Sequence, residues 1–253
     1  MTQPTSVYLI TGAASGIGAR LALKLAGSGV GLALHTRGNQ SGLQTTADQA
    51  SAKGATVLSL LGDLMAPTEA SRVVENIAKT FGRLDGLVSN AGFPDRTGFD
   101  DLNPNDLTQS FEAMPGAFMR LMQASQSMLR ASPCARVVAV SSFVAHRFYL
   151  EGDMFPASAI AKSGLESAVR VLATQFAGDA IPINAVVPGY IRKDREAGID
   201  LDEVSATRLG TPHIPMRRIG EPEEVVAAIE FLLSPGASYI TGQCLHIDGG
   251  MML

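Results

Sequence analysis

The sequence of 253 residues lacks long hydrophobic runs and a leader-like N-terminus. It contains no apolar span of about 18 residues, the length that a membrane helix needs. The first residues, MTQPTSVYLI, show no basic region followed by a long apolar one. We therefore expect a cytoplasmic protein with no membrane partner.

Cysteines are scarce, and no segment is strongly basic. Cys134 and Cys244 are far apart and have neither CxxC nor Cys/His spacing, which is typical of buried reduced thiols rather than a disulfide framework or a zinc site. We expect no metal. The net charge is −4, and no Lys/Arg-rich run could follow a phosphate backbone, so we expect no nucleic-acid partner. With these partners excluded, we expect the protein to act on a small molecule.

Short β-branched runs alternate with helical patterns along the chain. This alternation predicts an α/β protein: a single doubly wound Rossmann-type domain over residues 1–253, with a seven-stranded, mainly parallel sheet and helices on both faces. The predicted strands are residues 6–10, 30–35, 55–60, 84–89, 135–140, 181–187 and 243–247, and the clearest helical patterns are residues 17–26, 69–81 and 163–176. Residues 190–222 lack clear periodicity and are predicted to form a flap near the carboxyl ends of the strands.

A glycine-rich turn joins the first predicted strand to the first predicted helix. The segment TGAASGIGARLALKLA has Gly12, Gly16 and Gly18 at this turn. Glycines here allow the backbone to approach a pyrophosphate, which the positive end of the following helix attracts. An ordinary loop is the alternative interpretation, but the strand before and the helix after it favour a dinucleotide site.

The residues after the second predicted strand bear on the choice of cofactor. A cofactor without a 2′-phosphate favours an acidic residue here, whereas the chain reads HTRGNQ, with Arg37 and no Asp or Glu. Arg37 therefore favours NADP(H), with NAD(H) as the less favoured cofactor. The alternative is a solvated loop arginine.

From end to end, the chain resembles the short-chain dehydrogenase/reductase family. The resemblance is carried by TGxxxGxG at residues 11–18, by GDL around Asp63, by NAG at residues 90–92, by PG at residues 188–189 and by the ending GEPEEVVAAIEFLLSPGASYITGQCLHIDGG. It implies a homotetramer or homodimer packed partly through the helix around Lys162. The cofactor-binding residues that it implies are Gly12, Ser15, Gly16, Ile17, Gly18, Arg37, Asp63, Leu64, Asn90, Ala91, Gly92, Lys162, Pro188, Gly189 and Ile191.

The expected catalytic residues are only partly present. The resemblance implies Asn, Ser, Tyr and Lys, the last two spaced as YxxxK; the serine matches Ser142 and the lysine matches Lys162. Ser158 stands in place of the tyrosine, Ala113 in place of the asparagine, and Lys193 in place of the threonine that usually follows PG. The proton donor of this pocket is therefore altered.

Several groups compete for the role of proton donor. Ser158 is a weak candidate because an aliphatic hydroxyl is far less acidic than a phenol, and losing a general acid costs about 10²- to 10⁴-fold in rate. Tyr149 could supply a phenol from the segment before the helix, although a loop tyrosine is more often a packing residue. His146 is a further candidate, but a lone loop histidine is usually solvated. Water is the remaining source.

The SxxxK spacing also resembles the dienoyl-CoA reductase branch of the family. There the resemblance implies hydride transfer to a conjugated C=C, with a tyrosine supplied near the fifth strand, where this chain has Phe143. The sequence therefore predicts an NADP(H)-dependent oxidoreductase acting on a carbonyl or an activated C=C of a small molecule. The alternatives are a cofactor-binding pseudoenzyme, acting as a sensor or partner subunit, and non-redox chemistry on the same scaffold.

Overall fold

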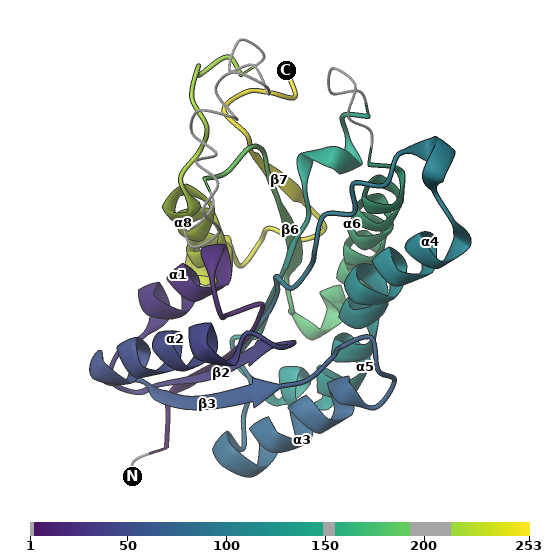
Figure 1. The fold of residues 1–253 in the computed structure, drawn as a ribbon. Helices are drawn as coiled ribbons and strands as arrows, with labels where there is room; N and C mark the ends of the chain where they lie inside the picture. The colour runs from purple at the N-terminus through teal and green to yellow at the C-terminus, as the bar shows by residue number, and fades with distance from the viewer. Residues whose placement is uncertain (1–2, 149–154, 193–213) are drawn as a thin grey trace.

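The computed structural model describes residues 3–148, 155–192 and 214–253. Seven parallel strands form one sheet in the order β3-β2-β1-β4-β5-β6-β7 (Figure 1). The strands are Ser6–Thr11 (β1), Val30–Thr36 (β2), Thr56–Leu61 (β3), Gly86–Ser89 (β4), Arg136–Val140 (β5), Ile183–Pro188 (β6) and Cys244–Ile247 (β7). The α-helices are Gly16–Leu25 (α1), Gln40–Ala52 (α2), Glu69–Phe81 (α3), Pro104–Phe111 (α4), Ala117–Ala131 (α5), Pro156–Phe176 (α6) and Pro222–Leu233 (α8).

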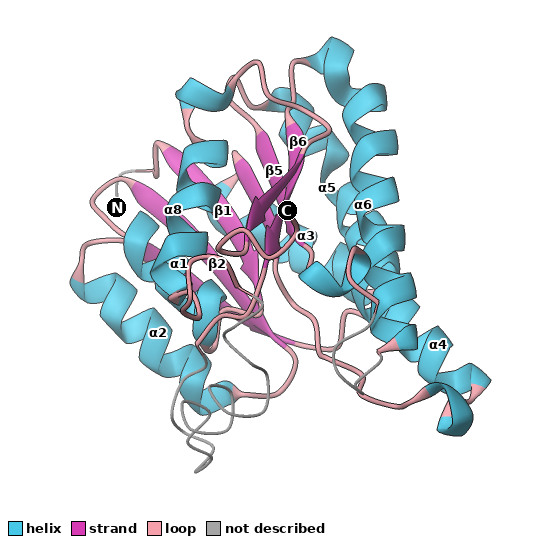
Figure 2. Ribbon diagram, turned by 90° about the horizontal axis from the view of Figure 1, so that it is seen from above, coloured by secondary structure: helices cyan, strands magenta, loops and turns pink. Residues whose placement is uncertain are grey.

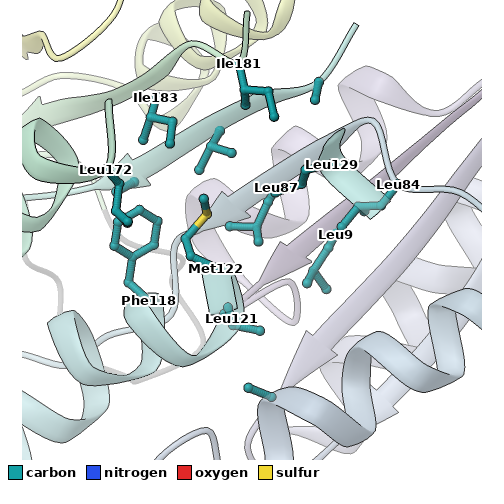
Figure 3. Packing of buried hydrophobic residues seen from close by; sticks show 14 of the residues in the cluster. Leu9, Leu84, Leu87, Phe118, Leu121, Met122, Leu129, Leu172, Ile181 and Ile183 are labelled. Carbon is teal, nitrogen blue, oxygen red and sulfur yellow. The ribbon is translucent and has the colours of Figure 1, made fainter. Parts of the chain in front are cut away.

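Helices cover both faces of the sheet, as the two views show. Helices α1, α2 and α8 lie on one face, and α3, α5 and α6 lie on the other, with α4 beside α6 (Figures 1 and 2). Each face has its own apolar core. On the α3–α5–α6 face, Phe118 and Met122 of α5 pack against Leu9, Leu87 and Ile183 of the sheet (Figure 3). This layered architecture confirms the predicted fold class.

The strand order reverses direction at β1. This strand pairs with β2 on one side and with β4 on the other. The chain therefore runs from β1 through β2 to β3 at one edge of the sheet, and from β4 through β5 and β6 to β7 at the other edge. A crevice opens beyond the carboxyl ends of the strands at such a point, and ligands of open α/β sheets bind there. The glycine-rich turn after β1 and the segment after β4 both reach this crevice.

The strands agree with the sequence predictions to within one or two residues. Helix α6 begins at Pro156, before the periodic pattern at residues 163–176, and carries both Ser158 and Lys162. Proline fits the first turn of a helix, where its missing N–H costs nothing, and it therefore starts α6 before that pattern. Of the predicted flap, residues 193–213 lie outside the described part.

Two further sequence interpretations can be compared with the structure. Cys134 is exposed rather than buried, because it lies in the turn before β5, and both cysteines are free. Among the described residues, no helix is long and apolar enough to span a membrane.

Candidate functional site

The glycine-rich turn after β1 is braced by the segment after β4. The Thr11 hydroxyl accepts hydrogen bonds from the backbone N–H groups of Asn90 and Ala91, both at 3.0 Å. In return, the Asn90 amide donates to the carbonyl oxygens of Thr11 at 2.9 Å and Gly12 at 3.2 Å. Thr11 and Asn90 therefore fix the turn against the neighbouring strand end, and the structure brings two of the predicted cofactor motifs together.

Backbone conformation and close contacts explain the glycines of this turn. Gly12 has a left-handed backbone with φ of 67°, and a β-carbon on Gly18 would collide with the carbonyl oxygen of Gly12. The start of α1 consequently packs close to the strand end. Ser15, the residue before the helix, is exposed and makes no side-chain capping bond. This exposed helix N-terminus behind a glycine turn fits a dinucleotide pyrophosphate, and half-buried Ile17 follows it.

The loop after β2 presents the predicted arginine at the same sheet edge. Arg37 is exposed and directly follows the strand. Before it, His35 is buried with its Nε2 3.6 Å from Glu69 Oε1, and burial lowers the pKa of His35 while Glu69 opposes that shift. The Arg72 guanidinium lowers the pKa of Glu69. Arg37 is therefore exposed at the carboxyl end of β2, two residues after buried His35.

The loop after β3 is held in place by an arginine on α5. Asp63 accepts a hydrogen bond from the Met65 backbone at 3.0 Å, and Leu64 is buried. Arg120 donates to the Leu64 carbonyl at 2.9 Å and to the Glu112 carbonyl at 2.8 Å. A single guanidinium thus connects the loop that carries Asp63 to the segment after α4.

Lys162 reaches from α6 to the end of β5. Its Nζ donates to the Val140 carbonyl at 2.7 Å, and a β-carbon on Gly92 would lie 3.5 Å from the same Nζ. Burial lowers the pKa of Lys162 to about 8, against the opposing effect of Glu166. Lys162, the end of β5 and the NAG segment therefore converge.

The two serines of the predicted catalytic group have different surroundings. Ser142 is half-buried at the start of the 3-10 turn Phe143–Ala145 (η3), where its Oγ accepts from the Val144 backbone at 3.5 Å. Ser158 is 4% exposed, accepts a hydrogen bond from the Asp95 N–H at 2.8 Å and donates to the Asp95 carbonyl at 3.3 Å. The Ser158 hydroxyl therefore ties α6 to the loop after β4. Tyr149 lies outside the described residues.

A π-helix occupies the position of the expected asparagine. Residues Glu112–Gly116 (η2) join α4 to α5 and contain Ala113, and Pro115 within this segment removes a backbone donor. Ala113 offers only a methyl group. Met114 is 2% exposed, and its sulfur would lie 3.5 Å from a β-carbon on Gly92. The wall of the pocket is apolar at this point.

The segment after β6 also lies at the carboxyl ends of the strands. The strand ends at Pro188, and a β-carbon on Gly189 would lie 2.8 Å from the Cα of Asp248, so glycine is needed for this approach. Ile191 forms an isolated parallel bridge with Gly220. Lys193 lies outside the described residues.

Two residues beside the pocket, Glu166 and Tyr190, were not identified as site residues from the sequence. Glu166 is 2% exposed, accepts from the Ser141 hydroxyl at 2.6 Å and lies 2.9 Å from His146 Nε2. His146 is exposed, as expected for a loop histidine, but its ring is also held by Glu166. The Tyr190 ring packs against Phe143, with ring centroids 4.7 Å apart. The position of Tyr190 directly after the PG pair was the available signal.

Comparisons with known proteins agree with this geometry. A family model described as Enoyl-(Acyl carrier protein) reductase matches residues 12–252. The chain belongs to the short-chain dehydrogenase/reductase family. It is 30% identical over 255 residues to 3-oxoacyl-(acyl-carrier-protein) reductase of Salmonella typhimurium, with 100% of both chains covered. It is 33% identical over 248 residues to 1-cyclohexenylcarbonyl-CoA reductase of Streptomyces collinus, which covers 98% of this chain and 87% of that protein.

Solved structures share the whole fold. One neighbour is described as YwfH, an NADPH dependent reductase involved in bacilysin biosynthesis; it has a TM-score of 0.87 and 28% identity, with 98% of both chains covered. Levodione reductase has a TM-score of 0.87 and 26% identity, with 99% of both chains covered. The predicted family and fold are therefore confirmed.

Proposed function

We propose that the protein is an NADP(H)-dependent oxidoreductase that reduces a carbonyl or an activated C=C of a small molecule. The observation that carries this proposal is the convergence of Lys162, the end of β5 and the NAG segment beside the braced glycine turn. The names of the relatives support both substrate types, since a 3-oxoacyl group offers a carbonyl and a 1-cyclohexenylcarbonyl group offers a conjugated C=C.

Arg37 supports NADP(H) over NAD(H). Its guanidinium is exposed at the end of β2, and residues 37–40 contain no acidic side chain that would repel a 2′-phosphate. A planar guanidinium suits bidentate binding of a phosphate. The description of YwfH as NADPH dependent agrees with this choice.

In this proposal, residues of the chain bind the cofactor, orient the substrate and supply the proton. The nicotinamide cofactor, when bound, supplies the hydride. Lys162 holds the ribose end, and the Ser142 hydroxyl donates to the substrate oxygen. Ser158 contributes no acid in this proposal, because its hydroxyl already bonds to the Asp95 backbone. The proton comes from Tyr149 or from water, and water suffices where the product anion is delocalised, as in an enolate.

Exposed apolar side chains support the proposed assembly as a homotetramer or homodimer. Ile160 and Val171 on α6 are 58% and 62% exposed, and Phe111 at the end of α4 is 50% exposed. Large exposed apolar side chains on adjacent helices are typical of interfaces. Light scattering of the purified protein would measure the assembly, and a monomer at all concentrations would contradict it.

The main test is the fall of NADPH absorbance with a panel of quinones, diketones and enoyl thioesters. We expect turnover on at least one class, and a lower Michaelis constant for NADPH than for NADH. In Arg37→Asp, we expect this preference to be lost. Saturable NADPH binding without turnover would instead favour a cofactor-binding sensor. The absence of any dinucleotide binding would overturn both functions.

A further inference from the structure

A hollow of about 570 Å³ lies where the segments after β5 and β7 meet. This volume falls within the range of small-molecule pockets. The C-terminal segment that forms one wall is yellow in Figure 1 and runs past the end of β7. The residues that line the hollow are His146, Arg147, His246, Met251, Met252 and Leu253.

The hollow is lined by one guanidinium, two imidazoles and three apolar side chains. Arg147 is half-buried, and within the described part of the chain its guanidinium has no hydrogen bond or ion pair. No acidic side chain is among the lining residues. A half-buried guanidinium without a counter-ion is a ready partner for a carboxylate or phosphate, which it binds with charge-assisted hydrogen bonds.

Two imidazoles stand beside each other in the same hollow. The His146 and His246 rings meet edge to face, with centroids 4.6 Å apart. His146 Nε2 is 2.9 Å from buried Glu166, and His246 Nδ1 is 3.7 Å from Asp248. A carboxylate on one ring nitrogen orients the ring, and the other nitrogen of a protonated imidazole can donate to an anion.

The segment that carries the methionines is held by Asp248 and by apolar packing. Asp248 accepts hydrogen bonds from the backbone N–H groups of Gly250 at 2.9 Å and Met252 at 3.1 Å. Below the wall, Met251 packs into a small apolar cluster with Phe143 and Val144 of η3. Hydrogen bonds and apolar packing therefore hold the segment that brings the methionines to the hollow.

The hollow adjoins the proposed catalytic residues. His146 closes the 3-10 turn that Ser142 begins, and Glu166 lies one helical turn after Lys162 on α6. On the other side, Asp248 touches Gly189 of the PG pair. A ligand in the hollow is thus near the residues that would hold the reacting group.

We propose that this hollow binds the anionic group of the substrate, a carboxylate or a phosphate, through Arg147, His146 and His246. The methionine wall receives the apolar part of the same molecule. The inference rests on the proposed function, because it names the substrate class of that site. A free carboxylic acid and a phosphate-bearing thioester are the two sources of such an anion.

The first test measures binding and needs no turnover. Levulinate, its neutral methyl ester and inorganic phosphate are titrated into the protein while the histidine ring resonances are followed by NMR. His146→Gln and His246→Gln identify two of the four histidines in the chain. We expect levulinate and phosphate to shift these two resonances but not that of buried His35, and the ester to shift neither. Equal responses to acid and ester would overturn the proposal.

The second test compares Arg147→Gln with Arg130→Gln, which removes the same charge from an exposed site on α5 beside Asp179. Substrate pairs are levulinate with its methyl ester, and crotonyl-CoA with the neutral N-acetylcysteamine thioester. We expect Arg147→Gln to lower kcat/KM for one anionic substrate by at least about tenfold more than for its neutral partner. The pair that responds identifies the source of the anion.

The failure of this inference is distinguishable from the failure of the proposed function. If both variants change kcat/KM equally for the charged and the neutral substrates, the proposed anion site is wrong, and the proposed oxidoreductase function is unaffected. Protein without turnover would contradict the proposed function, while the NMR titration would still decide the anion site.

Discussion

Lys162 has a lowered pKa, which makes cofactor affinity depend on pH. Below pH 8 its ammonium is charged and attracts the anionic dinucleotide, and above pH 8 it becomes neutral. We expect the Kd for NADPH to rise about 10- to 100-fold through a midpoint near pH 8. Lys162→Arg keeps its charge and should remove the midpoint. Fluorescence titration at successive pH values measures both proteins, and identical profiles would contradict this role.

Ser158 has a structural task that can be measured by itself. Ser158→Ala removes the acceptor of the Asp95 N–H, and an unsatisfied polar group costs about 1–2 kcal/mol of the free energy of unfolding. Urea denaturation measures this loss. Ser167→Ala, at an exposed position on the same helix, should change stability by less than about 0.5 kcal/mol. Equal stability of the two variants would show that the bond contributes nothing.

Residue patterns predicted the cofactor side of the site better than its chemistry. Gly12, Gly18 and Asn90 could be found because a tight turn restricts both residue type and spacing. The bond between His146 and Glu166 could not be predicted, because the two residues are twenty positions apart and meet only when α6 packs on η3. Side-chain contacts across elements leave no local signal in a sequence.

At the scale of elements, the junction of β1 and α1 sets the approach of a cofactor. Gly18→Ala would press its methyl group against the Gly12 carbonyl. We expect a loss of about 1–3 kcal/mol in the free energy of unfolding and a loss of NADPH binding. Gly27→Ala adds the same methyl group just after α1, where nothing lies within 4 Å of it. Calorimetric titration should show wild-type affinity in that control, and unchanged affinity in Gly18→Ala would refute the steric argument.

Helices and strands were predictable from the sequence where a single pattern, such as burial on both faces or helical periodicity, determined them. Strands β5 and β6 are buried at every position, and the apolar runs VVAV and AVV make up most of them. Helix α3 was predicted with its observed bounds because its apolar positions repeat with helical periodicity and Gly82 ends it in a left-handed conformation. The first turns of α6 contain small residues without periodicity, so their helical conformation follows from the family resemblance and from Pro156 at the helix start rather than from periodicity.

At the scale of the molecule, one sheet joins two apolar cores. Phe118 is fully buried on the α3–α5–α6 face (Figure 3). Phe118→Ala should cost about 3–5 kcal/mol of the free energy of unfolding, whereas Phe99→Ala, at a 71% exposed position, should cost less than about 0.5 kcal/mol. Because both cores share the strands, circular dichroism and tyrosine fluorescence should report the same denaturation midpoint. Separate midpoints would mean that the faces unfold independently.

The bonds between Ser158 and Asp95 also limit which side chains position 158 can carry. The buried Ser158 hydroxyl holds the loop after β4, so an aromatic ring at this position would displace that loop. A larger residue at 158 is therefore compatible with this structure only together with a second change that gives the Asp95 backbone another partner.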